Sequence, residues 1–234
     1  MLFNLLQTDI PETVAEIAPV QQEMSYSLIE MATKGGWLML VLLALSLVAL
    51  YLFGKKWWMI RQAGQIDKNF IRDIKDYIND GKQKSALSLC AHYDSPVARM
   101  VETGISRIGK PLADIQSAIE NVGNVEVARL EKGLPYLATI AGGAPMIGFL
   151  GTVTGMVKAF FNMANAGSNV DISLLSGGIY EAMITTVGGL IVGILAYFGY
   201  NFLTAKISNV IIKMENATVS LMDFLNTNDK AAEE

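Results

Sequence analysis

Residues 141–159 read AGGAPMIGFLGTVTGMVKA, and residues 182–196 read AMITTVGGLIVGILA. In both stretches small residues recur at offsets of three and four, which places them on one face of an α-helix. A threonine lies on each face, Thr152 in the first stretch and Thr186 in the second. Faces of this kind let membrane helices approach closely and form hydroxyl hydrogen bonds. The two stretches therefore predict an all-α membrane protein whose helices meet at a polar contact.

The composition of the 234-residue chain supports a membrane location. Hydrophobic residues make up 52% of it and charged residues 17%, whereas a soluble domain usually carries about 25% charged residues. The net charge of −4 is unfavourable for a general nucleic-acid partner. Because the chain has one cysteine, Cys90, and one histidine, His92, it has neither a disulfide framework nor a Cys/His metal cluster.

Three apolar stretches are long enough to cross a bilayer, whose hydrocarbon core is about 30 Å thick. The first is the uncharged stretch 35–54. The second and third predicted membrane helices are 133–161 and 177–205, with uncharged cores at 133–157 and 182–205. The sequence therefore predicts an integral membrane protein with three transmembrane helices.

The distribution of basic residues predicts the orientation of these helices. Residues 55–132 hold 13 of the 18 lysines and arginines, and segments rich in these residues remain in the cytoplasm. The acidic N-terminal segment 1–34 and the loop 162–176 are then expected on the outer side. The C-terminal segment 206–234 returns to the cytoplasm. In a bacterial cell this arrangement corresponds to the inner membrane with a periplasmic N-terminus.

The segment 55–132 is predicted to be helical, so that the second and third membrane helices extend into a helical cytoplasmic domain. Ser95 and Pro96 have the residue types of a helix N-terminus, with serine as the cap and proline in the first turn. The helix that leads into the second membrane span is expected to bend at Pro135. The chain after Asn226 is expected to be disordered.

Helix geometry predicts that the two threonines lie at the same depth. Each lies about seven residues from the centre of its membrane helix, which places both hydroxyls roughly 10 Å from the midplane on the outer side. Glu181 lies five residues before Thr186, nearer the outer edge. Two ordinary interpretations compete with a functional one. A threonine hydroxyl often bonds to the carbonyl four residues earlier, and a carboxylate at this depth can lie among headgroups or pair with a basic residue.

The middle of each predicted membrane helix carries no Asp, Glu, Lys or His. A threonine hydroxyl relays a proton but does not store one near neutral pH. A proton path through these helices would therefore need a carboxylate from another polypeptide, and several copies of this chain to enclose a pore. The alternative is a membrane scaffold that uses its small-residue faces for oligomerisation alone. An intramembrane enzyme is disfavoured because these helices contain no nucleophile, base or metal set.

Two motifs in the chain resemble the signature of the MotA/TolQ/ExbB proton-channel family. They are residues 144–156, APMIGFLGTVTGM, and residues 178–190, GIYEAMITTVGGL, the second followed by Tyr200-Asn201. By motif the resemblance covers about residues 95–210. Three membrane helices with an outer N-terminus are similar to the ExbB/TolQ branch, whereas flagellar MotA proteins have four.

The resemblance implies a homopentamer around ExbD- or TolR-like single-span helices that supply an intramembrane aspartate. It implies that Thr152 and Thr186 face this aspartate, and that Glu181 is the glutamate preceding the second threonine. Thr185, also a candidate for the proton pathway, stands where many members of the family have a small residue, and the resemblance assigns its hydroxyl no role. The helix-packing residues are expected to be Gly148, Gly151, Gly155, Gly189 and Gly193. Proton flow would drive work on the outer membrane through a TonB- or TolA-like protein, without a cofactor and without enzymatic activity.

Overall fold

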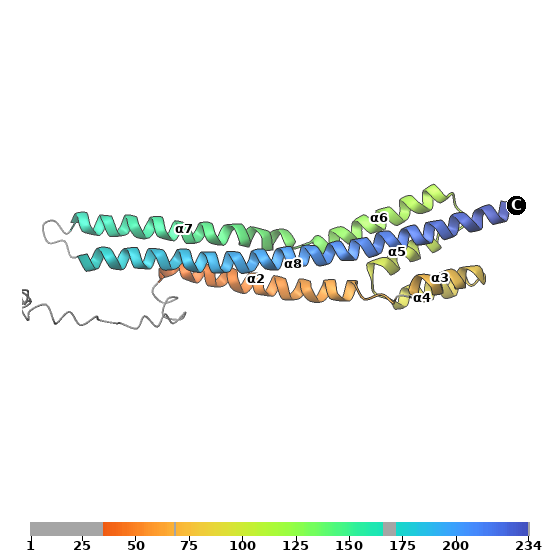
Figure 1. Ribbon diagram of the computed structural model, residues 1–234, viewed down its shortest axis with the longest axis horizontal. Helices are drawn as coiled ribbons and strands as arrows, with labels where there is room; N and C mark the ends of the chain where they lie inside the picture. Colours follow the sequence, from red (N-terminus) through yellow and green to blue (C-terminus); the bar gives the residue numbers. More distant parts are fainter. Residues whose placement is uncertain (1–34, 68, 166–171, 234) are drawn as a thin grey trace, which may run out of the picture.

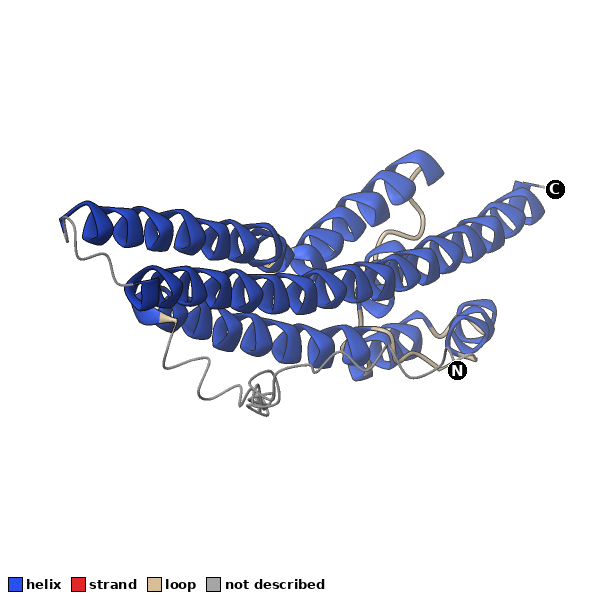
Figure 2. Cartoon of the chain, turned by 60° about the vertical axis from the view of Figure 1, so that its left-hand side comes forward, coloured by secondary structure: helices blue, strands red, loops and turns tan. Residues whose placement is uncertain are grey.

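The computed structural model describes residues 35–67, 69–165 and 172–233. This part of the chain contains helices and loops and no strand, which confirms the all-α prediction (Figure 2). The expectations for residues 1–34 and for residues 166–171 fall outside the described residues, and the rest of the expected loop 162–176 belongs to the ends of α7 and α8. The helices are α2 Gly36–Ala63, α3 Phe70–Asn79, α4 Gln83–His92, α5 Pro96–Ile105, α6 Leu112–Glu131, α7 Leu134–Asn165 and α8 Ile172–Glu233.

The three longest helices, α2, α7 and α8, lie side by side, with α8 between the other two (Figure 1). α2 and α8 run in the same direction and α7 runs in the opposite one (Figure 1). Among the described residues, three helical stretches are long and apolar enough to cross a membrane, as predicted. Large apolar side chains such as Trp37, Leu47 and Phe198 are more than half exposed on these helices. Such a surface suits contact with lipid or with other membrane helices.

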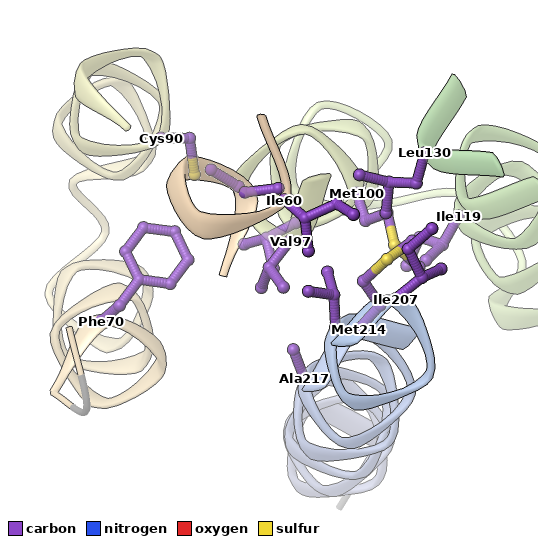
Figure 3. Close-up of a cluster of buried hydrophobic side chains, with 14 of the residues drawn as sticks. Ile60, Phe70, Cys90, Val97, Met100, Ile119, Leu130, Ile207, Met214 and Ala217 are labelled. Carbon is purple, nitrogen blue, oxygen red and sulfur yellow. The ribbon is translucent and has the colours of Figure 1, made fainter. Parts of the chain in front are cut away.

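Beyond these apolar stretches, α3 to α6 form a helical domain together with the second half of α8 (Figure 1). Its core belongs to a cluster of buried side chains to which each of the helices α2 to α8 contributes (Figure 3). The expected N-terminus of α5 is confirmed, because Ser95 Oγ accepts a hydrogen bond from the Ala98 amide at 3.2 Å and Pro96 occupies the first turn. The predicted extension of the membrane helices into a helical domain is therefore present.

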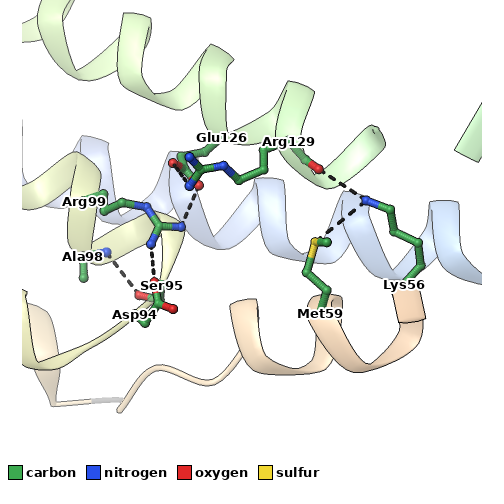
Figure 4. Close-up of polar contacts among 8 residues, drawn as sticks. All are labelled: Lys56, Met59, Asp94, Ser95, Ala98, Arg99, Glu126 and Arg129. Carbon is green, nitrogen blue, oxygen red and sulfur yellow. Dashed lines mark hydrogen bonds and ion pairs between the residues drawn. The ribbon is translucent and has the colours of Figure 1, made fainter. Parts of the chain in front are cut away.

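A buried lysine and an ion-pair cluster join these helices across long sequence separations (Figure 4). The Lys56 ammonium donates to the carbonyls of Arg129 and Leu130, at 3.3 and 3.1 Å, where α6 ends. A positive charge is favourable at the C-terminal end of a helix, where carbonyl groups are not yet paired. The carboxylate of Glu126, which is 5% exposed, accepts from Arg99 at 2.7 Å and from Arg129 at 3.2 Å.

Two details of the predicted helices are wrong. The chain bends before α7 at Gly133 rather than at Pro135, because Gly133 adopts φ +97°, a left-handed conformation that glycine accommodates without strain. Pro135 then lies in the first turn of α7, where a missing amide hydrogen costs little. The segment after Asn226 is not disordered but continues α8 as far as Glu233, because Leu221 and Leu225 hold the preceding turns in the core.

Candidate functional site

The backbones of α7 and α8 approach each other closely where glycines of the two helices meet. A Cβ atom added at Gly189 would lie 2.6 Å from the Ala144 carbonyl oxygen, and one added at Gly148 would lie 2.9 Å from the Thr185 carbonyl oxygen. Real Cβ atoms essentially never show contacts under 3.0 Å, so only glycine fits at this separation. The other expected packing glycines lie along the same contact, and they are Gly151, Gly155 and Gly193.

The hydroxyls of Thr152 and Thr186 meet across this close contact and hydrogen-bond to each other. Thr186 Oγ1 also donates to the Gly148 carbonyl oxygen on α7 at 3.0 Å. The carbonyl oxygens nearest Thr152 Oγ1, those of Ala182 and Gly148, lie farther away at 3.4 and 3.5 Å. Thr186 thus bonds across the helices rather than back along its own helix, which disfavours the ordinary interpretation for this residue. The two half-buried hydroxyls lie at one level, as the helix geometry predicts.

The shorter distance to a carbonyl oxygen belongs to Thr186, which favours one direction for the hydroxyl hydrogens. Each hydroxyl has one hydrogen to donate and two lone pairs to accept with. If Thr186 donates to the Gly148 carbonyl, Thr152 is the donor in the bond between the two threonines. A lone pair of Thr152 Oγ1 then remains available for a donor from outside this helix pair. The pair can accept a hydrogen bond from a protonated carboxyl group, and rotation of the Thr152 hydroxyl would let it donate to an ionised one.

Thr185 lies apart from this hydroxyl pair, although it is the next residue along the chain. Its side chain is buried, and Thr185 Oγ1 donates to the Ala182 carbonyl oxygen of its own helix at 2.7 Å. It packs against Gly151 on α7. The structure therefore places the Thr185 hydroxyl in a satisfied internal bond, between α7 and α8 but outside the Thr152–Thr186 contact.

Glu181 faces the beginning of α2. Glu181 Oε1 lies 2.6 Å from the position that a Cβ atom of Gly36 would occupy, and Gly36, the first residue of α2, has φ +63°. An anion is favoured near the N-terminus of a helix, where amide groups are not yet paired. Glu181, Thr185 and Lys158 line the same cavity of about 150 Å³. No described basic residue forms an ion pair with Glu181 within 4.0 Å.

Sequence reasoning missed the part that Gly36 takes in this arrangement. The sequence does contain the pair Gly35-Gly36 at the start of an apolar helix. That pair did not indicate that the Glu181 side chain would occupy the space beside Gly36. The described residues hold no group of three or more His, Cys, Asp or Glu that could bind a metal ion. The arrangement thus provides hydroxyls, one carboxylate and one lysine, which are groups that can form hydrogen bonds and ion pairs.

The family model described as the MotA/TolQ/ExbB proton channel family matches residues 92–216, which include both threonines and Glu181. A Synechocystis sp. protein named ExbB-like 1 is 32% identical over 176 residues, or 74% of this chain and 68% of that protein. The biopolymer transport protein ExbB of Xanthomonas campestris pv. campestris is 34% identical over 116 residues, 50% of this chain and 46% of that protein. The Tol-Pal system protein TolQ of Haemophilus influenzae is 37% identical over 87 residues, 37% of this chain and 38% of that protein.

The match agrees with the structure on two independent points. The matched region contains the α7–α8 contact with its hydroxyl pair, and the three long apolar helices suit a multi-pass membrane protein. The matching family is a transport family and not a known enzyme family. The chain belongs to the MotA/TolQ/ExbB proton channel family, on its ExbB/TolQ branch.

Proposed function

We propose that this chain is the stator-type subunit of a proton channel that converts the proton motive force into mechanical work. In this proposal five copies enclose an ExbD- or TolR-like single-span partner, and a TonB- or TolA-like protein carries the work to the outer membrane. The observation that carries the proposal is the hydroxyl pair of Thr152 and Thr186, held between α7 and α8 at one level.

The hydroxyl pair suits a carboxyl group that changes its protonation state. Thr152 accepts a hydrogen bond while that group is protonated, and its hydroxyl donates after the proton has left. An ionised carboxylate at membrane depth is costly, and a hydroxyl donor lowers that cost. Each proton that crosses releases about 2.3 kcal/mol per 100 mV of membrane potential. In this scheme that free energy would drive movement of the partner helix.

The titrating carboxyl group must come from outside this chain. Within the predicted membrane helices, the Asp, Glu, Lys, Arg and His residues are limited to Lys158 and Glu181. Both lie on the outer side of the hydroxyl pair, at the end where α7 finishes and α8 begins. In the proposal Glu181, placed against the start of α2 by Gly36, attracts protons toward the hydroxyl pair, and Thr185 supports the helix contact beside it.

The proposal includes an orientation in the bacterial inner membrane. The basic segment 55–132 would lie in the cytoplasm and the N-terminus in the periplasm, because 13 of the 18 lysines and arginines fall in that segment. The helical domain of α3 to α6 would then lie on the cytoplasmic side, and Glu181 on the side from which protons enter.

The first experiment isolates the chain from its native membrane in mild detergent and identifies by mass what stays bound. We expect several copies of the chain with a single-span protein that carries an intramembrane aspartate. Proton flux is then measured in proteoliposomes for the complex with Thr152→Val or Thr186→Val. Both variants should lose flux and retain assembly, because valine preserves the shape of threonine and removes the hydroxyl.

Thr154→Val is the matched control, because Thr154 is exposed on the same helix and donates to the Leu150 carbonyl oxygen at 2.8 Å. Normal flux in the Thr152 and Thr186 variants would refute a role in proton transfer. Loss of assembly in both variants would show that these residues only pack the helices together. A homo-oligomer without a carboxylate-bearing partner would favour the scaffold alternative.

A further inference from the structure

A cavity of about 450 Å³ lies between α2 and α8, just beyond the apolar stretches of both helices. Its charged lining residues are all positive, and they are Arg61, Lys206 and Lys213. Lys206 directly follows the uncharged stretch 182–205, and Arg61 lies two turns after the stretch 35–54. Because α2 and α8 run in the same direction (Figure 1), these cations gather at one face of the predicted membrane.

The cations of this cavity carry charge that no described carboxylate balances within 4.0 Å. Lys213 Nζ donates to the Gly64 carbonyl oxygen at 2.9 Å, and Lys206 Nζ lies 5.5 Å from the centre of the Phe202 ring. Both contacts are with neutral groups. A diffuse positive site of this kind complements an anion that brings several oxygen atoms.

A second cavity, of about 670 Å³, follows the same two helices into the apolar region. It is lined mainly by apolar side chains, among them Ala49, Phe53 and Leu195. Phe202 and Trp57 separate the two cavities, with their rings stacked at 4.9 Å and 12°. Aromatic residues of this type are enriched at the level where a membrane changes from hydrocarbon to headgroup.

We propose that the two cavities together bind one anionic phospholipid. Its phosphate would lie among Arg61, Lys206 and Lys213, and an acyl chain would follow the apolar cavity along α2 and α8. The change from cationic to apolar lining occurs at the aromatic residues Trp57 and Phe202, which is where a lipid changes from headgroup to chain. Basic residues near a membrane surface attract anionic lipids. This binding goes beyond the proposed function, because it is independent of proton conduction.

Tryptophan fluorescence tests the proposal on the full-length chain. In the W37F/W58F background, Trp57 is the remaining tryptophan, and it lines the cationic cavity. The chain is reconstituted in phosphatidylcholine vesicles that contain a minority of brominated phosphatidylglycerol or of brominated phosphatidylcholine. We expect the brominated phosphatidylglycerol to quench Trp57 with an association constant at least about 25-fold higher, because each cation of the cavity contributes about fivefold. This comparison needs no change in the cations, so it decides the proposal even if a cation variant fails to fold.

Substitutions then assign the selectivity to the cavity. R61Q/K206Q should lower the preference for the anionic lipid by about fivefold for each cation removed. K55Q should leave it unchanged, because Lys55 lies on the same helix, six residues before Arg61, and does not line the cavity. S46F, which fills the apolar cavity, should weaken quenching by both lipids, whereas A44F on an exposed position of the same helix should not.

Three results would overturn the proposal. Equal quenching by the two lipids would show that the cations select no headgroup. An equal effect of K55Q and of R61Q/K206Q would show a general surface charge instead of a site. Quenching by neither lipid would show that another polypeptide, such as a second copy of this chain, covers the cavity.

Discussion

Gly189→Ala separates the two helices that carry the hydroxyl pair. The new Cβ would lie 2.6 Å from the Ala144 carbonyl oxygen, and restoring ordinary contact at 3.4 Å requires a displacement of about 0.8 Å. The obstacle is backbone, which no rotamer change can move. A displacement of this size would lengthen the bond from Thr186 Oγ1 to the Gly148 carbonyl, now 3.0 Å, beyond hydrogen-bonding distance.

The expected loss of stability combines two contributions. Overpacking of a well-packed contact costs about 1–3 kcal/mol, and an interhelical hydrogen bond in a membrane protein contributes about 0.6 kcal/mol. We therefore expect Gly189→Ala to lower the free energy of unfolding by about 2–4 kcal/mol. Unfolding by SDS in mixed micelles, followed by circular dichroism, measures this value.

Gly142→Ala is the matched control, because a Cβ at Gly142 on α7 meets no atom within 4 Å. Alanine favours a helix over glycine by up to about 1 kcal/mol, so this variant should be as stable as the unsubstituted chain or more stable. Equal stability of Gly189→Ala and Gly142→Ala would refute the conclusion that α7 and α8 touch through their backbones at this point.

Further predictions concern three residues of the helical domain. Burial raises the pKa of the Cys90 thiol to about 12, so maleimide should label it only after unfolding, and labelling of the folded chain at the rate of a free thiol would contradict this. An unfolded thiol ionises near pH 9.0. The contribution of Cys90 to the free energy of unfolding should therefore be complete below that pH and decline as the pH rises toward 12. Urea titrations at several pH values measure this decline. Lys56→Met should lower the free energy of unfolding by about 1–3 kcal/mol by leaving two carbonyls at the end of α6 without their donor, whereas exposed Lys55→Met should not. Glu126→Gln should cost about 1–3 kcal/mol in the same titration, since Arg99 keeps partial access to water; a cost no larger than that of exposed Glu131→Gln would contradict the buried ion pair.

Periodic patterns predicted the part of the molecule that depends on local helix geometry. Offsets of three and four placed Thr152 and Thr186 on helix faces, and equal distances from the helix centres placed them at one level, where the structure brings their hydroxyls together. Ser95 and Pro96 marked the start of α5 because capping is decided within one turn. These features need only the residues of the same or the adjacent helix.

Contacts between distant segments could not be predicted in this way. Lys56 reaches the end of α6 across 73 and 74 residues, and nothing within one turn of either segment indicates the pairing. Glu126 stands among charged neighbours that suggest a solvated helix face, but Arg99 on another helix encloses it. The bend at Gly133 was missed because proline is the more familiar cause, although only glycine adopts that φ easily.

The 62-residue helix α8 has a mechanical consequence. From Thr186 to Glu233 the chain remains one helix, which at 1.5 Å per residue is about 70 Å of stiff rod. A tilt of about 5° at the level of the hydroxyl pair would displace the far end by about 6 Å. The chain is interrupted between α6 and α7 at Gly133, so a tilt of α7 would not be carried rigidly into α6. α8 would therefore transmit a small tilt at the hydroxyl pair directly to the helical domain, whose core contains Leu221 and Leu225 of α8.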